Sequence, residues 1–312
     1  MKKTVNQKRI RLLKDGIQTE GPVAYWMSRD QRARDNWALL FAQEQALLQK
    51  KPLLVMFCLV PGFLNATMRQ YAFMLKGLEE VAGSLRTQNI PFYLGTGTPE
   101  QVVPKVIQRH DISTLVTDFD PLKIKRRWKD RVAERIAVPF FEADAHNIVP
   151  CWTASPKQDF AARTFRPKIG ASLYEFLEDF PPLKKHPYEG NGKIPAIPWQ
   201  TIGKDLTVDR TVSEVNWLKP GEKAARSVLR DFITKKLHSY NDTRNDPTRD
   251  GQSNLSPYLH FGHIAAQRVA LEVRKSLVTG ASRESYLEEL IVRRELSDNF
   301  CFYNDKYDTI KG

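Results

Sequence analysis

One polar turn in the last quarter of the sequence carries groups that suit a phosphate. Residues 252–256 read Gln-Ser-Asn-Leu-Ser and precede Pro257, so hydroxyls and backbone N–H groups stand where a helix is expected to begin. Such a turn suits phosphate oxygens, because the N–H groups and the helix dipole both favour negative charge. The same residues also make an ordinary helix start, with serine as the N-cap and proline at the first helical position. Taken alone, the turn leaves both interpretations open.

Charged and aromatic residues stand at regular spacings on either side of this turn. Tyr240 and Arg244 are four residues apart, and residues 288–299 read Glu-Glu-Leu-Ile-Val-Arg-Arg-Glu-Leu-Ser-Asp-Asn. In a helix, Glu289 and Arg293 share one face. An ordinary helical ion pair, worth about 0.2–0.5 kcal/mol, explains this spacing as well as a binding site does.

Helical periodicity dominates the segment that must position these residues. Pro220 opens a helix whose apolar side chains fall on one face: Ala224, Val228, Leu229, Phe232, Ile233 and Leu237. Further helices are predicted at residues 256–261, which Gly262 ends, and at residues 264–278 and 286–299. Residues 217–312 are therefore predicted to form an all-α domain.

A different pattern occupies residues 20–146, where short apolar runs alternate with helical stretches. The runs are residues 23–27, 53–60, 91–94, 114–117 and 139–141. Because they are continuous rather than alternating, they are typical of strands buried on both faces. The order of strands and helices predicts an α/β domain with a doubly wound, five-stranded parallel sheet. The only glycine-rich turn after a strand, at residues 95–100, lacks the third glycine of a dinucleotide site, so we expect a simple strand-to-helix turn.

Three other segments are predicted to be peripheral. Residues 1–19 are basic and lack the apolar core of a secretory signal, so a mobile arm is expected. Residues 147–216 are rich in proline and are predicted to be an interdomain linker. The charged residues that follow the first run are predicted to form a solvated cluster of little energetic weight: Arg29, Asp30, Arg32 and Asp35.

The composition is that of an ordinary globular protein with an excess of positive charge. The chain has 312 residues, 41% hydrophobic and 27% charged, and a formal net charge of +12. Its length fits two domains, and its charge favours a polyanionic partner. Three widely spaced cysteines indicate reduced thiols and an intracellular protein, cytoplasmic or nuclear. No stretch approaches the roughly 20 apolar residues of a membrane span, so no membrane association is expected.

Several of these motifs together resemble DNA photolyases and cryptochromes. The pattern Ser-x-Leu-Ser-Pro-Tyr-Leu at residues 253–259 and Glu-Leu-Ile-x-x-Arg-Glu at residues 289–295 are features of the flavin-binding domain of that family. Residues 293–303 and 146–168 are similar to the class II cyclobutane-pyrimidine-dimer photolyases, and residues 25–39 resemble the first strand and helix of the family's N-terminal domain. The resemblance covers residues 20 to 307.

The resemblance implies a bound FAD and light-driven repair of UV-damaged DNA that contains pyrimidine dimers. Tyr240 is expected beside the cofactor, and the turn is expected to hold the FAD phosphates through Gln252, Ser253, Asn254, Leu255 and Ser256. The dimer is expected to contact Arg244 and Glu289, with Arg293 and Arg294 at phosphate or cofactor. No side chain is expected to act as a catalytic acid or base, because the cofactor performs the chemistry.

The resemblance also leaves several points open. Class I photolyases carry a tryptophan three residues after the glutamate, where this chain has Val292. Photolyases of this class continue well beyond the point where this sequence ends, so an incomplete flavin domain is expected, in either a fragment or a short homologue. A cryptochrome-like photoreceptor without repair activity and an inactive DNA-binding homologue are the alternatives. The N-terminal domain of the family can hold a deazaflavin or folate antenna chromophore, and a monomer is expected.

Overall fold

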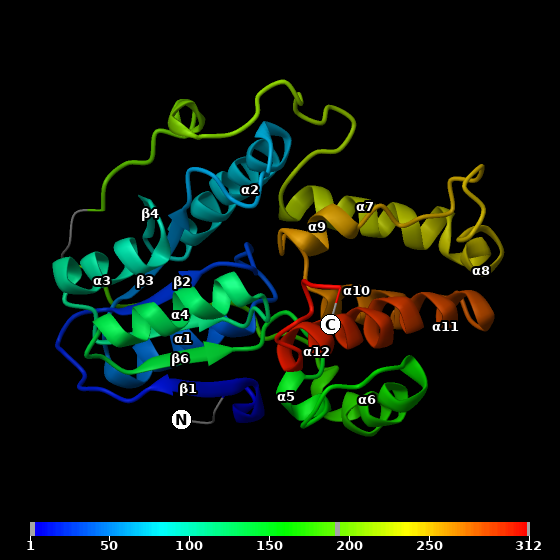
Figure 1. The fold of residues 1–312 in the computed structure, drawn as a ribbon, viewed down its shortest axis with the longest axis horizontal. Coiled ribbons are helices and arrows are strands. Elements are labelled where there is room, and N and C mark those ends of the chain that lie inside the picture. The colour runs from blue at the N-terminus through cyan, green and yellow to red at the C-terminus, as the bar shows by residue number, and fades with distance from the viewer. Residues whose placement is uncertain (1–3, 191–193, 311–312) are drawn as a thin grey trace.

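A six-stranded sheet forms the N-terminal half of the protein (Figure 1). The computed structural model describes residues 4–190 and 194–310. The strand order is β1-β6-β5-β2-β3-β4, and all neighbours except β1 and β6 run parallel. The five parallel strands confirm the predicted runs: β2 (Val23–Met27), β3 (Leu53–Leu59), β4 (Phe92–Thr96), β5 (Thr114–Asp118) and β6 (Phe140–Ala143).

Helices cover both faces of this sheet, as a doubly wound fold requires. They are α1 (Trp37–Gln49), α2 (Met68–Thr87), α3 (Pro99–His110) and α4 (Lys123–Arg135). Within β2, Tyr25 packs into the core beneath α1 and α2, while its neighbour Trp26 packs into the core beneath α3 and α4. Because both faces are buried, the strand reads as a continuous apolar run. The glycine turn after β4 leads directly into α3, as predicted.

The segment predicted to be a mobile basic arm contributes the edge of the sheet. After the short 3-10 helix η1 (Gln7–Arg9), strand β1 (Ile10–Lys14) pairs antiparallel with β6. The Arg9 side chain is fully buried, and its guanidinium donates hydrogen bonds to the carbonyls of Asn147 at 3.0 Å and Ile148 at 2.7 Å. The prediction was therefore wrong for these residues, because Arg9 has acceptors inside the protein that offset the cost of its burial.

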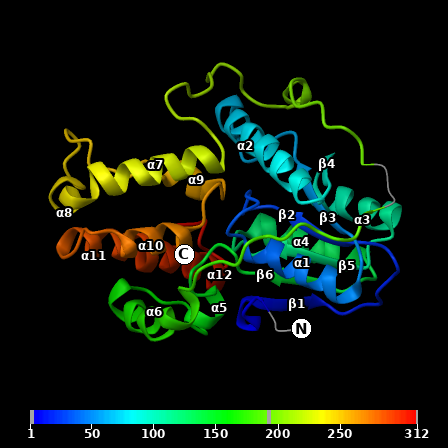
Figure 2. The same cartoon turned by 180° about the vertical axis from the view of Figure 1, so that it is seen from behind.

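The predicted linker is only partly irregular. It contains α5 (Cys151–Ala154) and α6 (Ala162–Phe176), and α6 buries Phe165 and Ile169 in the core of the helical unit. The chain then extends across the sheet and over α2 before it reaches α7, as Figure 2 shows from behind. On this stretch lies the 3-10 helix η2 (Ile202–Asp205). The aromatic residues of α6 make it part of the fold rather than a tether.

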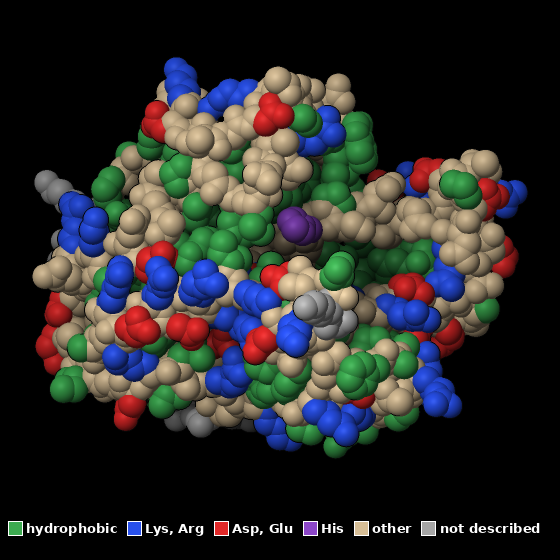
Figure 3. Space-filling model, in the orientation of Figure 1, with side chains coloured by type: hydrophobic (Ala, Val, Ile, Leu, Met, Phe, Trp, Pro, Cys, Tyr) green, Lys and Arg blue, Asp and Glu red, His purple; other side chains and the backbone are tan. Residues whose placement is uncertain are grey.

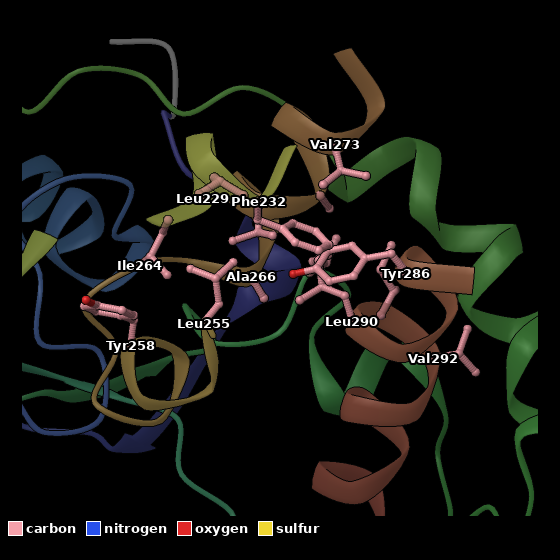
Figure 4. Close-up of a cluster of buried hydrophobic side chains, with 14 of the residues drawn as sticks. Leu229, Phe232, Leu255, Tyr258, Ile264, Ala266, Val273, Tyr286, Leu290 and Val292 are labelled. Carbon is pink, nitrogen blue, oxygen red and sulfur yellow. The ribbon is translucent and has the colours of Figure 1, made fainter. Parts of the chain in front are cut away.

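The C-terminal unit is all-helical, as predicted. Its elements are α7 (Glu222–Lys235), η3 (Leu237–Ser239), α8 (Tyr240–Thr243), α9 (Ser256–His260), α10 (Ala266–Lys275), α11 (Ala281–Leu287), a π-helical segment (Glu288–Arg293) and α12 (Arg294–Tyr303). Leu229 and Phe232 of α7 meet Tyr286 of α11 and Leu290 in the apolar core between these helices (Figure 4). Among the described helices, none is long and apolar enough to cross a membrane.

A buried polar network joins the two units. Arg32 is 1% exposed and donates to Asp30 at 2.6 Å, to the Gly262 carbonyl at 3.1 Å and to the Ala145 carbonyl at 2.8 Å. Although burial opposes ionisation, Arg32 holds the pKa of Asp30 below its usual range. The predicted solvated cluster is wrong for these two residues, because the helical unit covers the end of β2 and supplies an acceptor.

Two carboxylates of the helical unit reinforce this interface. Glu222 accepts the backbone N–H of Ala33 at 2.6 Å, and Glu295 accepts that of Ile148 at 2.6 Å. Burial raises the pKa of each carboxyl to about 7, although the N–H donors act in the opposite direction. Beside them, Asp298 of α12 forms a bidentate ion pair with Arg29, at 2.9 and 3.0 Å. The relative position of the two units is thus fixed by directional bonds as well as by apolar packing.

Candidate functional site

The serine-bearing turn presents backbone N–H groups without internal partners. Asn254 has a left-handed backbone with φ of +56°, and buried Leu255 anchors the turn to the core. In the described parts of the chain, the backbone N–H groups of Ser253, Asn254 and Ser256 meet no acceptor within hydrogen-bond distance. A left-handed residue followed by a right-handed one is the backbone arrangement of an anion-binding nest, in which the N–H of Leu255 contacts Oγ of Ser253 at 3.4 Å.

The short helix that follows adds little to this site. α9 spans only five residues, Ser256–His260, and Pro257 has no N–H to offer. The expected helix dipole is therefore weak, because a dipole grows with the number of aligned peptide units. The turn itself, rather than the helix, provides the donors that the sequence indicated.

Tyr240 lies in an aromatic group directly behind the turn. Its ring meets Phe232 edge to face at 5.9 Å and Tyr286 at 5.1 Å between centroids. Burial raises the pKa of Tyr286, and the nearby Ser253 side chain of the turn opposes that rise. Tyr240 is 6% exposed, and burial raises its pKa. The aromatic group therefore supports the turn from behind.

Arg244 and Glu289, predicted from separate segments, meet in the structure. Their side chains form an ion pair with Nη1 and Oε1 2.9 Å apart, and both remain partly exposed. The Arg244 guanidinium lies 6.0 Å from the Tyr240 ring centre, and Gln252 donates to the Arg244 carbonyl at 2.6 Å. The turn, the tyrosine, the arginine and the glutamate thus form one continuous arrangement, called here the Arg244 cluster: Tyr240, Arg244, Gln252, Ser253 and Glu289.

Arg293 does not join this cluster, because the helix changes register. Residues Glu288–Arg293 form a π-helix, in which hydrogen bonds reach five residues back instead of four. Arg293 consequently lies 3.8 Å from Glu288, five residues earlier, and its side chain is 58% exposed. Arg293 is therefore paired with Glu288, whereas Glu289 is paired with Arg244. Segments of this kind frequently occur at functional sites.

A separate cavity of about 490 Å³ lies between the two units. Ser256 and Arg294 line it, whereas Tyr240, Arg244 and Glu289 lie outside its wall. The predicted residues therefore belong to two neighbouring sites, with the turn between them. Figure 3 shows that the surface is hollowed and apolar at this cavity, with a histidine at its edge, and again between α7 and α11.

The cavity is mostly apolar and carries a few buried polar groups. Sequence reasoning missed Lys125, whose Nζ lies 4.9 Å from the Phe63 ring centre and 5.0 Å from that of Trp128. Burial lowers the pKa of Lys125 and of His260, which also lines the cavity. Apolar walls with a small number of convergent polar groups are typical of cofactor and ligand sites. The helical face of residues 123–129 was the only signal in the sequence, and it gave no reason to expect a cavity.

Comparisons with known proteins agree with this fold and these motifs. A sequence model of the DNA photolyase family matches residues 23–186. The chain is 47% identical to a deoxyribodipyrimidine photo-lyase of Potorous tridactylus over 98% of its length and 44% identical to that of Arabidopsis thaliana over 99%. It spans 59% and 66% of the length of these two relatives.

The fold is shared with solved structures at much lower sequence identity. A cryptochrome of Synechocystis matches with a TM-score of 0.72 at 18% identity, covering 91% of this chain and 62% of that protein. A class III photolyase of Agrobacterium tumefaciens matches with a TM-score of 0.70, also at 18% identity, over 92% of this chain and 60% of that one. The fold is therefore that of photolyases and cryptochromes. With its close relatives and the match over residues 23–186, the chain belongs to the DNA photolyase family.

Proposed function

We propose that the chain binds FAD and acts in the light-driven repair of pyrimidine dimers in DNA. The observation that carries this proposal is the Arg244 cluster, in which an anion-binding turn, an aromatic layer and an exposed ion pair adjoin one another. The relatives named deoxyribodipyrimidine photo-lyase support it. UV-damaged DNA would be the partner, and the basic chain suits a polyanion.

The residues present fit the cofactor. The unpaired N–H groups of Ser253, Asn254 and Ser256 suit the two phosphates of FAD, which need several donors converging on one point. Tyr240 and Tyr286 are 6% and 5% exposed and form a packed aromatic layer that supports the turn from behind. When bound and reduced, FAD supplies a light-excited electron for dimer cleavage, whereas the protein supplies geometry and electrostatics.

Arg244 and Glu289 are assigned to the lesion itself. Their charges neutralise each other in the structure, and both side chains are accessible, at 27% and 41% exposure. A pair of this kind can open to present a guanidinium to a phosphate or carbonyl and a carboxylate to base N–H groups. A dimer is poorly stacked, so its extrusion from the duplex costs less than that of an intact pair, which favours damaged sites.

The interdomain cavity is assigned to a second, light-harvesting chromophore, a deazaflavin or a folate. Its volume of about 490 Å³ suits a planar organic molecule, and its apolar lining would exclude water from it. Lys125 and Arg294 provide positive charge at the wall for an ionised ring or side group. The monomeric state and the intracellular location proposed from the sequence fit a DNA repair function.

A flavin photoreceptor without repair activity is the second candidate. Val292 is 6% exposed in the helical core, so it offers the DNA no surface at a position where class I photolyases place tryptophan. This candidate predicts a chain that binds FAD but does not split a pyrimidine dimer under blue light. The fold shared with a Synechocystis cryptochrome is consistent with either candidate.

One pair of variants tests the lesion assignment. Arg244→Ala should weaken binding to dimer-containing DNA about 10- to 150-fold more than binding to the same undamaged sequence, because it removes a charged contact worth about 1.5–3 kcal/mol. Arg249→Ala is the matched control, since Arg249 lies on the same loop and is 63% exposed. Kd values from fluorescence anisotropy decide between the outcomes. An equal loss on both DNAs would make Arg244 a plain phosphate contact.

A further inference from the structure

The outer face of α6 combines arginine with exposed aromatic side chains. The helix buries Phe165, Ile169 and Phe176, so residues on the opposite side face solvent. By i+3, i+4, i+7 and i+11 spacing from Arg163, one face carries Arg163, Arg166, Pro167, Gly170 and Tyr174. With Phe160, which directly precedes the helix, these residues are called the α6 face. The segment was expected to be a linker, and neither the FAD nor the lesion assignment uses it.

The aromatic residues at its two ends are almost completely exposed. Phe160 is 86% and Tyr174 is 85% accessible, and they bracket a helix of 15 residues, about 22 Å long. Between them, a Cβ added at Gly170 would meet no atom within 4 Å, so the middle of the face is low and open. An extended partner can therefore approach the helix closely along its length.

The charge of the face is positive, and it is continuous with the Arg244 cluster. Arg163 has no carboxylate partner among the residues that the structure describes. Arg166 pairs with Glu288 at 2.7 and 3.0 Å, and Arg293 lies 3.8 Å from the same carboxylate. Two arginines, Arg166 and Arg293, thus share one acid, Glu288, which is the chain neighbour of Glu289. Figure 3 shows Lys and Arg side chains at the lower right edge, where Figure 1 places α6.

We propose that the α6 face binds the phosphate backbone of duplex DNA beside the lesion. The inference rests on the proposed function and extends it, because it names the element that holds the undamaged flank. Arginine forks match phosphate oxygens, and exposed rings next to them pack on sugars and bases. A chain of net charge +12 suits this partner. The π-helical segment connects the flank contact to the lesion residues, since Glu288 and Glu289 lie on it.

Binding to two DNA lengths tests the proposal. One probe is a duplex with a central dimer that extends past α6, and the other is a short dimer-containing oligonucleotide that spans only the Arg244 cluster. Arg163→Ala should weaken binding to the long duplex roughly three- to tenfold and lower the slope of log Kd against log salt by about 0.9, the value for one phosphate contact. Binding to the short oligonucleotide should stay unchanged. Arg163→Lys should restore most of the affinity.

Controls separate this inference from the proposed function. Arg109→Ala removes an equal charge from α3, at the opposite end of the molecule in Figure 1, and should leave both affinities unchanged. Tyr174→Ala should weaken binding to the long duplex and leave binding to the short oligonucleotide unchanged. If Arg163→Ala behaves like Arg109→Ala while Arg244→Ala loses dimer preference, the α6 face is not a DNA contact and the proposed function stands. If the wild-type chain shows no dimer preference, the proposed function fails, and the long-duplex comparison still decides the role of α6. If the protein itself forms a homodimer at high concentration and Tyr174→Ala abolishes that association, the α6 face is instead a contact between two protein chains.

Discussion

Replacing Arg32 with alanine should lower the free energy of unfolding far more than the loss of a solvent-exposed charge would. The guanidinium is 1% exposed and makes bonds to Asp30, to the Ala145 carbonyl and to the Gly262 carbonyl of the helical unit. Alanine would leave the Asp30 carboxylate, which is 0% exposed, without its principal counter-charge. It would also leave two buried carbonyls without these donors.

The expected magnitude follows from the burial of the pair. Removing one partner of a buried ion pair costs about 3–5 kcal/mol, because the remaining charge stays desolvated. With a urea dependence of about 3 kcal/mol per molar for a chain of this size, the unfolding midpoint should fall by about 1–1.7 M. Arg34 provides the matched control two residues away, since it is exposed. Arg34→Ala should change stability by less than about 0.5 kcal/mol.

Urea unfolding followed by tryptophan fluorescence measures both variants. Circular dichroism of each variant in the absence of urea establishes that the secondary structure is intact before the midpoints are compared. Equal midpoints for Arg32→Ala and Arg34→Ala would refute the reasoning. That result would mean that the end of β2 is solvated and that the two units are not joined there.

Two further predictions concern packing and pH. Gly77→Ala should destabilise the protein by about 1–3 kcal/mol, because the new Cβ would lie 2.2 Å from Nε2 of His263. In Gly83→Ala, on the same helix, the new Cβ meets no atom within 4 Å, so this variant should be more stable by up to about 1 kcal/mol. Thermal unfolding measures both variants. Burial would raise the pKa of Asp298, but Arg29 lowers it to about 2, below the unfolded value of about 4. The folded state therefore favours the charged form, and stability present above pH 4 should decline by about 2 kcal/mol as the pH falls toward 2. Asp298→Asn should remove most of that decline, and an unchanged pH profile would contradict the assignment.

The parallel strands and the helical unit were predictable because their signals are local. Residues 23–27 are apolar without interruption, since Tyr25 and Trp26 face opposite but equally buried cores. The periodicity of α7 likewise records which side of the helix is buried. Strand β1 carries no such signal, because it lies at an edge and its residues are only partly buried. The burial of Arg9 depends on distant carbonyls, which no sequence pattern reveals.

The site was predicted in part for similar reasons. Tyr240, Arg244 and the turn at residues 252–256 are close in sequence, so their proximity follows from short loops. The pairing of Arg293 with Glu288 was not predicted, since an α-helix was assumed where residues 288–293 form a π-helix. The interdomain cavity depends on how the two units dock, and docking relies on bonds such as that between Arg32 and Gly262. The sequence around Lys125 therefore does not indicate that this residue lines a cavity.

The most direct test of the central claim is an absorption spectrum of the purified chain after incubation with FAD and removal of the free cofactor. The account predicts flavin bands in the blue at about one FAD per chain, because the unpaired N–H groups of the turn provide a phosphate site that the buried Tyr240 ring supports. A spectrum with protein absorption alone, from a chain whose circular dichroism shows it to be folded, would contradict the claim that the Arg244 cluster is built around a flavin.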